Sequence, residues 1–220
     1  MFKLEYVIFF FFIFNVATSA KENVSSTKIL GEMTCISSNG IPNHEIGKFP
    51  NRANPNHFKE QKLSFCFPTF PQLTEKVTWG LMTVGVSIKG IPFRPFTAEY
   101  FDPNTKRGYS KNPSSGWRKQ AMHNPRSLGI DKQNGHIDRS GLYHYHSVVK
   151  QSNDSKKDIL IGYAPDGFQI VYRPSGIISS WHLKSGRRPS PPGGIHDGQF
   201  EEDFEYRFKS GALDQCNGLK

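Results

Sequence analysis

The chain has 220 residues, 36% of them hydrophobic, and a formal net charge of +9. A chain of this length can bury a core without metal or disulfide staples, so folding does not require its histidines to bind a metal. Lysine and arginine occur in scattered pairs and never form a block, and no nucleic-acid-binding module is recognisable, so we expect no nucleic-acid partner. The basic net charge is compatible with an anionic glycan or an anionic surface as a partner.

The first 20 residues have the pattern of a secretory signal peptide. Lys3 precedes an apolar run at residues 6–14, and small residues at 17–20 lead to Lys21. The run is shorter than the roughly 20 residues that span a bilayer, and no later segment is apolar enough to do so. We therefore expect cleavage after Ala20, secretion to the extracellular space and no transmembrane segment in the mature chain.

Secretion would place the three cysteines in an oxidising compartment, where disulfides persist. Cys35 and Cys66 lie in strand-like runs of the amino-terminal third, and we predict that they pair. Cys216 is left over, which indicates an intermolecular partner, a free thiol or a partner missing from this chain. The alternative is that all three are buried free thiols.

Residues 21–75 are expected to form a loop-rich amino-terminal segment. Two short strands, at residues 33–36 and 63–67, would be bridged by a long loop rich in Asn, Pro and His. In this interpretation His44 and His57 are loop residues rather than ligands.

From residue 76 the pattern becomes clearly β. Hydrophobic residues at 84, 86 and 88 alternate with small or polar ones, and residues 89–90 predict a tight turn into a hairpin. Residues 94–126 are loop-rich, with room for one short helix at 117–122 that Ser114 or Ser115 would cap. A second hairpin is predicted at 159–172 with its turn at 164–168, followed by a strand at 181–183 and an acidic alternating run at 201–206.

Residues 134–146, which read N-G-H-I-D-R-S-G-L-Y-H-Y-H, concentrate the groups that can do chemistry. Side chains alternate between the two faces of a strand, so His144 and His146 would share one face. Residues 138–141 place Asp first and Gly fourth in a type I turn that closes a three-residue hairpin loop. This loop pairs Asp138 with Leu142 and therefore puts His136 opposite His144.

The predicted register gathers three imidazoles and one carboxylate. His136, Asp138, His144 and His146 would then supply three nitrogen ligands and one oxygen ligand to zinc, copper or iron. The alternative is a hydrogen-bonded polar seam without metal, and a register slip of one residue would separate His136 from the other two. Three residues of the carboxyl-terminal half could join the cluster: Asp166, His196 and Asp197.

Two pairs of segments resemble each other in the same order. Residues 90–95 resemble 167–174, and residues 130–135 resemble 213–218, which indicates an internal duplication. The first copy continues into the histidine hairpin, whereas the second stops at Lys220. A duplication therefore predicts that the chain is truncated at its carboxyl end.

The run G-L-Y-H-Y-H at residues 141–146 resembles the signature of the YHYH-domain family. Residues 134–138, N-G-H-I-D, are similar to the family's lead-in, and residues 162–170, G-Y-A-P-D-G-F-Q-I, to its G-Y-x-x-D-G-F-x-I block. The resemblance implies a YHYH domain at residues 76–220 and a secreted or envelope protein. It implies no particular reaction, because the family has no established one.

We expect a mainly β fold, a short-stranded sandwich or distorted barrel with long loops and two related halves. The first function hypothesis is a secreted protein that binds a divalent transition metal through the histidine hairpin, with enzyme activity left open. The alternative is a noncatalytic extracellular binding or structural module that recognises a glycan or anionic surface through exposed Trp117, exposed Trp181 and the basic surface.

Overall fold

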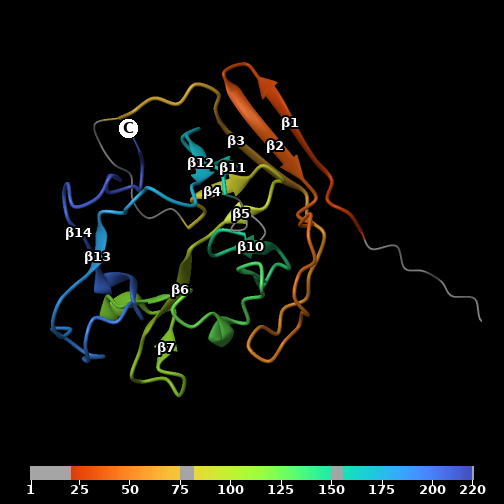
Figure 1. The fold of residues 1–220 in the computed structure, drawn as a ribbon. Helices are drawn as coiled ribbons and strands as arrows, with labels where there is room; N and C mark the ends of the chain where they lie inside the picture. The colour runs from red at the N-terminus through yellow and green to blue at the C-terminus, as the bar shows by residue number, and fades with distance from the viewer. Residues whose placement is uncertain (1–20, 75–81, 150–155, 220) are drawn as a thin grey trace, which may run out of the picture.

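The computed structural model describes residues 21–74, 82–149 and 156–219. The predicted signal peptide and residues 76–81 of the first predicted β segment lie outside these ranges. The described chain is mainly β, as predicted, and its strands form several small sheets without closing a barrel (Figure 1). Within these ranges, no helix has the length and apolar character needed to cross a membrane.

The amino-terminal sheet consists of β1 (Ser25–Leu30), β2 (Met33–Ser38) and β3 (Leu63–Pro68), in antiparallel order. Cys35 lies directly opposite Cys66, and the two form the predicted disulfide. Cys216 is an exposed free thiol. The two strands and the long loop between them therefore follow the sequence interpretation.

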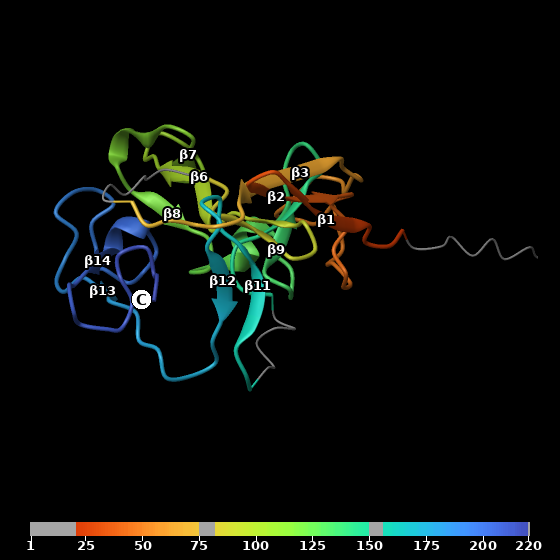
Figure 2. The ribbon, with the colours of Figure 1, turned by 90° about the horizontal axis from the view of Figure 1, so that it is seen from above.

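The central sheet has six short strands in the order β12-β11-β4-β5-β10-β9. Their bounds are β4 (Gly85–Ser87), β5 (Pro92–Phe93), β9 (Gly135–Ile137), β10 (Tyr143–Tyr145), β11 (Ile159–Tyr163) and β12 (Gln169–Tyr172). All neighbours are antiparallel except β5 and β10, which run parallel with Phe93 beside Tyr145. In Figures 1 and 2 this sheet lies between β1–β3 at one end and β13–β14 at the other.

The predicted hairpins β4–β5 and β11–β12 of the central sheet are confirmed. Between β4 and β5, the N–H of Gly90 donates to the carbonyl of Ser87, and Gly90 takes the left-handed φ of 74° that the tight turn requires. Between β11 and β12, the N–H of Ala164 donates to the carbonyl of Phe168. These turns set which residues of each strand face the core.

The core lies on one face of the central sheet. Its buried members are Ile91, Phe93, Ile137, Tyr143, Tyr145 and Ile161. A second cluster of Ile36, Phe67 and Val86 packs the amino-terminal sheet against β4. The two clusters make the amino-terminal sheet part of the same packed body.

The loop between β2 and β3 covers the outer edge of the β9–β10 hairpin. The side-chain amides of Asn54 and Asn56 both donate to the carbonyl of Ile137, at 2.8 Å each, and the N–H of Lys59 donates to the carbonyl of Gly141. The β9–β10 hairpin is therefore held by the β2–β3 loop as well as by its strand pairing within the sheet.

The rest of the chain forms two further sheets and short 3-10 turns. The β7-β6-β8 sheet contains β6 (Phe96–Phe101), β7 (Tyr109–Ser110) and β8 (Arg118–Gln120), and β13 (Trp181–Leu183) pairs with β14 (Phe204–Tyr206). The 3-10 turns are η1 (Pro113–Ser115), η2 (Pro125–Leu128) and η3 (Glu201–Asp203). The predicted strand at 181–183 is confirmed.

The predicted helix at 117–122 is wrong. Asn112 caps η1, the left-handed Gly116 ends it, and the next residues join a sheet because Arg118 pairs with Tyr100 of β6. The expectation that Trp117 is exposed is also wrong, since only 6% of this residue is accessible.

The two segments that suggested a duplication, 130–135 and 213–218, adopt the same turn. In each, the aspartate N–H donates to the glycine carbonyl and the aspartate Oδ1 accepts the glycine N–H, with a left-handed asparagine between. The hairpin loop at Asp138 repeats the pattern with Gly141 as the left-handed residue. Shared turn chemistry therefore accounts for this similarity, and duplication of the chain stays a prediction.

Candidate metal centre

The predicted register of the histidine hairpin is confirmed. The N–H of Asp138 donates to the carbonyl of Leu142 at 3.0 Å, and Gly141 has a φ of 89°. His136 is paired with His144, and Tyr143 with Ile137. A three-residue loop closed by a left-handed glycine therefore places His136 and His144 on one face.

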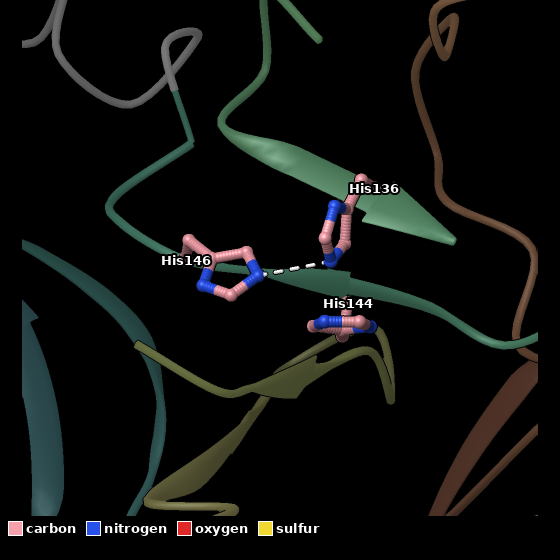
Figure 3. Close-up of side chains that lie close together, drawn as sticks. All are labelled: His136, His144 and His146. Carbon is pink, nitrogen blue, oxygen red and sulfur yellow. Dashed lines mark hydrogen bonds between the residues drawn. The ribbon is translucent and has the colours of Figure 1, made fainter. Parts of the chain in front are cut away.

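Figure 3 shows that the three imidazoles converge. One ligand nitrogen from each of His136, His144 and His146 lies within 4.8 Å of the others. The Nε2 atoms of His136 and His146 are 3.1 Å apart. His144 and His146 are each 5% accessible, while His136 is partly exposed. These three side chains could hold a metal ion.

Backbone carbonyls engage the other nitrogen of each ring. His136 Nδ1 lies 2.8 Å from the carbonyl oxygen of Leu128, and His146 Nδ1 lies 3.2 Å from that of Pro95. His144 Nδ1 makes a longer contact of 3.4 Å with the carbonyl of Leu142. Because a carbonyl only accepts, the tautomer that satisfies the contacts of His136 and His146 has its proton on Nδ1, and the Nε2 of each of these two rings then presents a lone pair.

The lone pairs of His136 and His146 would repel each other unless a proton or a cation lies between them. Two nitrogen ligands of a tetrahedral zinc ion, each about 2.0–2.1 Å from the metal, lie about 3.3 Å apart. The observed separation of 3.1 Å is close to that value. The spacing of this pair of nitrogens therefore fits two ligands of one transition metal.

Burial keeps the three rings neutral. It lowers the pKa of His136, and together with the charges of the neighbouring histidines it lowers the pKa of His144 well below its ordinary value and that of His146 to about 4. Neutral imidazole is the form that binds metals, so at neutral pH no proton has to be displaced from Nε2.

Asp138 lies on the predicted face, but its carboxylate is engaged elsewhere. Oδ2 accepts a hydrogen bond of 2.9 Å from Arg94, while Oδ1 accepts the N–H groups of Ser140 and Leu142 at 2.8 and 3.1 Å. Burial alone would raise the pKa of Asp138, but these turn contacts outweigh it and lower the pKa. Among the described residues, the group with converging ligand atoms contains only the three histidines.

The two tyrosines of the Y-H-Y-H run anchor the strand from the opposite face. The hydroxyl of Tyr143 donates to Asp131, 2.9 Å from Oδ2, and that of Tyr145 lies 2.8 Å from His44 Nε2. Burial raises the pKa of both tyrosines, so both stay neutral donors. The tyrosines of the alternating run therefore hold the strand in place through their hydroxyl contacts. The histidines, on the other face, are left to form the cluster.

The three residues expected to join from the other half do not reach the cluster. Asp166 is exposed in the turn between β11 and β12, whereas His196 and Asp197 belong to a separate network around Arg188 and Asp203. The contacts of the Leu128 and Pro95 carbonyls with the histidine rings were not predicted, because every residue has a backbone carbonyl and the sequence does not indicate which one is used.

The comparison with protein families gives one match. The model described as "YHYH protein" matches residues 64–220, well over half of the chain. No curated protein and no solved structure matches it. The match contains the histidine hairpin and the other two hairpins of the central sheet, β4–β5 and β11–β12, and the chain therefore belongs to the YHYH family.

Proposed function

We propose that His136, His144 and His146 bind a divalent transition metal through Nε2, with zinc, copper and iron as the candidates. The observation that carries the proposal is the 3.1 Å separation of the Nε2 atoms of His136 and His146, each ring having its Nδ1 on a carbonyl. A hydrogen-bonded seam without metal would need a proton between these two nitrogens, at the cost of a buried charge or of one hydrogen bond from Nδ1 to its carbonyl.

Three protein nitrogens leave one position of a tetrahedral ion for water or a small ligand, which is the arrangement of catalytic zinc sites. The proposal is therefore a metal centre with an open position, and it names no reaction. Asp138 would act as a positioning residue, because its ion pair with Arg94 holds the loop that joins the strands of His136 and His144.

We also propose that the protein is secreted. The Cys35–Cys66 disulfide supports this location, since such bonds persist in oxidising compartments. The signal-peptide pattern of residues 1–20 supports it independently.

Elemental analysis of the purified secreted chain tests the metal proposal. The variants are His136→Asn, His144→Asn and His146→Asn, because Asn keeps a donor near the position of Nδ1 but has no Nε2. The control is His57→Asn, in an exposed loop position. We expect near-stoichiometric metal in wild type and control, and a large loss in the three variants. Wild-type protein that stays metal-free after reconstitution with each candidate ion would overturn the proposal.

A specific surface favours the second candidate function, binding of an anionic glycan. An open pocket of about 990 Å³ is lined by the exposed cations Lys48, Arg52, Arg126 and Lys132. Within the described chain none of the four has an acidic partner, and of the two acidic residues there, Asp131 is occupied by Tyr143 and backbone N–H groups. Unpaired positive charge around a hollow attracts polyanions.

Elution from a sulfated-polysaccharide column tests this second function. Replacing the four pocket cations by Ala is expected to lower the salt concentration needed for elution. The control replaces four exposed cations elsewhere, Lys28, Lys106, Lys111 and Arg139, which changes the net charge equally. Equal shifts in the two quadruple variants would show attraction to net charge and reject the pocket.

A further inference from the structure

Another histidine, His196, lies outside the metal centre, between β13 and η3 in the chain. His196 Nδ1 lies 3.0 Å from Oδ1 of Asp203, whose side chain is completely buried. The carboxylate also accepts from Arg188, at 2.7 and 2.6 Å, and from the N–H groups of Gly198 and Phe200. Asp203 is therefore a fixed anion, and the Nδ1 of His196 donates to it.

The His196 ring also lines a pocket. The His196 side chain is only 6% accessible and contributes to the lining of an open pocket of about 570 Å³. In the described part of the chain, Nε2 has no hydrogen-bond partner. A carboxylate that orients an imidazole so that its free nitrogen meets a pocket is the arrangement that binding and catalytic sites use.

Three other residues of the lining can donate hydrogen bonds. The Ser190 hydroxyl oxygen accepts from the indole N–H of Trp117 at 2.9 Å, which leaves the hydroxyl hydrogen to donate. Lys184 uses one of its three donors on the carbonyl of Glu202, and Arg187 is exposed without an ion pair among the described residues.

The lining carries a net positive charge. Lys184 and Arg187 contribute two positive charges, and Glu202, the acidic residue of the lining, contributes at most one negative charge. The Glu202 carboxylate is engaged by the N–H of Arg118 at 2.6 Å. The pocket therefore offers cationic and hydroxyl donors together with the imidazole of His196, which is mostly buried.

We propose that this pocket binds a small hydroxylated acid, a sugar acid or a sugar phosphate. Arg187, Lys184 and Ser190 take its anionic group, and the Nε2 of His196 accepts a hydrogen bond from one of its hydroxyls. The site shares no residue with the metal centre, so its test does not depend on metal content.

NMR of ¹⁵N-histidine-labelled wild-type protein tests the proposal, with glucuronate and glucose 6-phosphate added in separate titrations at constant ionic strength. The His196 resonances are assigned by their loss in His196→Asn, which keeps a donor for Asp203. We expect a saturable shift of these resonances with at least one probe, at an apparent affinity that Arg187→Ala weakens about tenfold. The probe that produces the shift distinguishes the two sources of the acid.

The control is Arg173→Ala, which removes a surface cation paired with Asp158 on another hairpin and should leave the affinity unchanged. The proposal fails if neither probe shifts the His196 resonances saturably. It also fails if the two arginine variants weaken binding equally, because the pocket would then contribute nothing beyond net charge.

Discussion

His136 on β9 and His146, directly after β10, approach each other through Nε2 at 3.1 Å while a different backbone carbonyl holds each Nδ1. Leu128 belongs to η2 and Pro95 follows β5, so both acceptors come from segments outside the hairpin. The two Nε2 atoms are therefore oriented before a metal ion binds, which reduces the conformational entropy that the side chains lose on binding.

Metal binding should stabilise the fold. A ligand that binds only the folded state at 100 times its dissociation constant adds about 2.7 kcal/mol to the free energy of unfolding. We expect zinc to raise the urea midpoint of chelator-treated protein, and to do so in the His57→Asn control but not in His146→Asn. Identical midpoints with and without zinc in the wild-type protein would contradict the metal centre.

Asp138→Asn should keep the metal and lose stability. The substitution removes the charge that pairs with Arg94, and because both side chains are about a quarter accessible we expect a modest loss of roughly 1 kcal/mol. Urea unfolding and elemental analysis of the same sample measure both effects. A folded Asp138→Asn protein that has lost its metal would instead make this carboxylate a ligand.

Gly135→Ala should disturb the metal centre through Tyr143, on the opposite face of the hairpin. A Cβ at this position would lie 2.3 Å from the ring of Tyr143, which is fully buried and hydrogen-bonded to Asp131. Overpacking of this kind costs roughly 1–3 kcal/mol, and displacement of Tyr143 would shift the adjacent His144. Unfolding midpoints and zinc affinity should both fall. Unchanged values would mean that Tyr143 moves without cost.

Glu201→Gln should stabilise the protein above pH 7 and not at pH 4. Burial and the neighbouring Glu202 outweigh the attraction of Arg118 and raise the pKa of Glu201 to about 7, from 4.5. As the pH rises, Glu201 therefore loses its proton at a lower pH in the unfolded chain than in the folded protein. The free energy of unfolding consequently falls between pH 4.5 and pH 7. Thermal melts across this range should show a shallower decline for the variant. Glu45→Gln, at an exposed loop position, is the control.

Loss of the disulfide should weaken the metal centre at a distance. Cys35 and Cys66 are separated by 31 residues, and closing such a loop is worth roughly 3–4 kcal/mol. The loop carries Asn54 and Asn56, which hold β9. We expect the Cys35→Ser/Cys66→Ser protein to melt lower and bind zinc more weakly, with Cys216→Ser unaffected. A double variant with wild-type zinc affinity would show that the loop does not support the hairpin.

Local turn chemistry explains which predictions succeeded. The register of the hairpin depends on Asp138 and Gly141, which lie within four residues of each other, so sequence was sufficient to place His136 opposite His144. The helix at 117–122 failed because pairing of Arg118 with Tyr100 overrides weak local preference. Signal-peptide cleavage, secretion and metal binding stay predictions.

The sequence by itself determined the mainly β class and the face shared by the three histidines, because alternation and turns act over a few residues. It also predicted the Cys35–Cys66 pair, because the signal-peptide pattern indicates an oxidising compartment and both cysteines lie in strand-like runs. Only the tertiary structure decided the tautomers, through the carbonyls of Leu128 and Pro95, and the partner of Asp138, through Arg94. It also brought His196 to Asp203 instead of to the hairpin. These contacts join segments far apart in the chain, where residue type alone does not specify which groups meet.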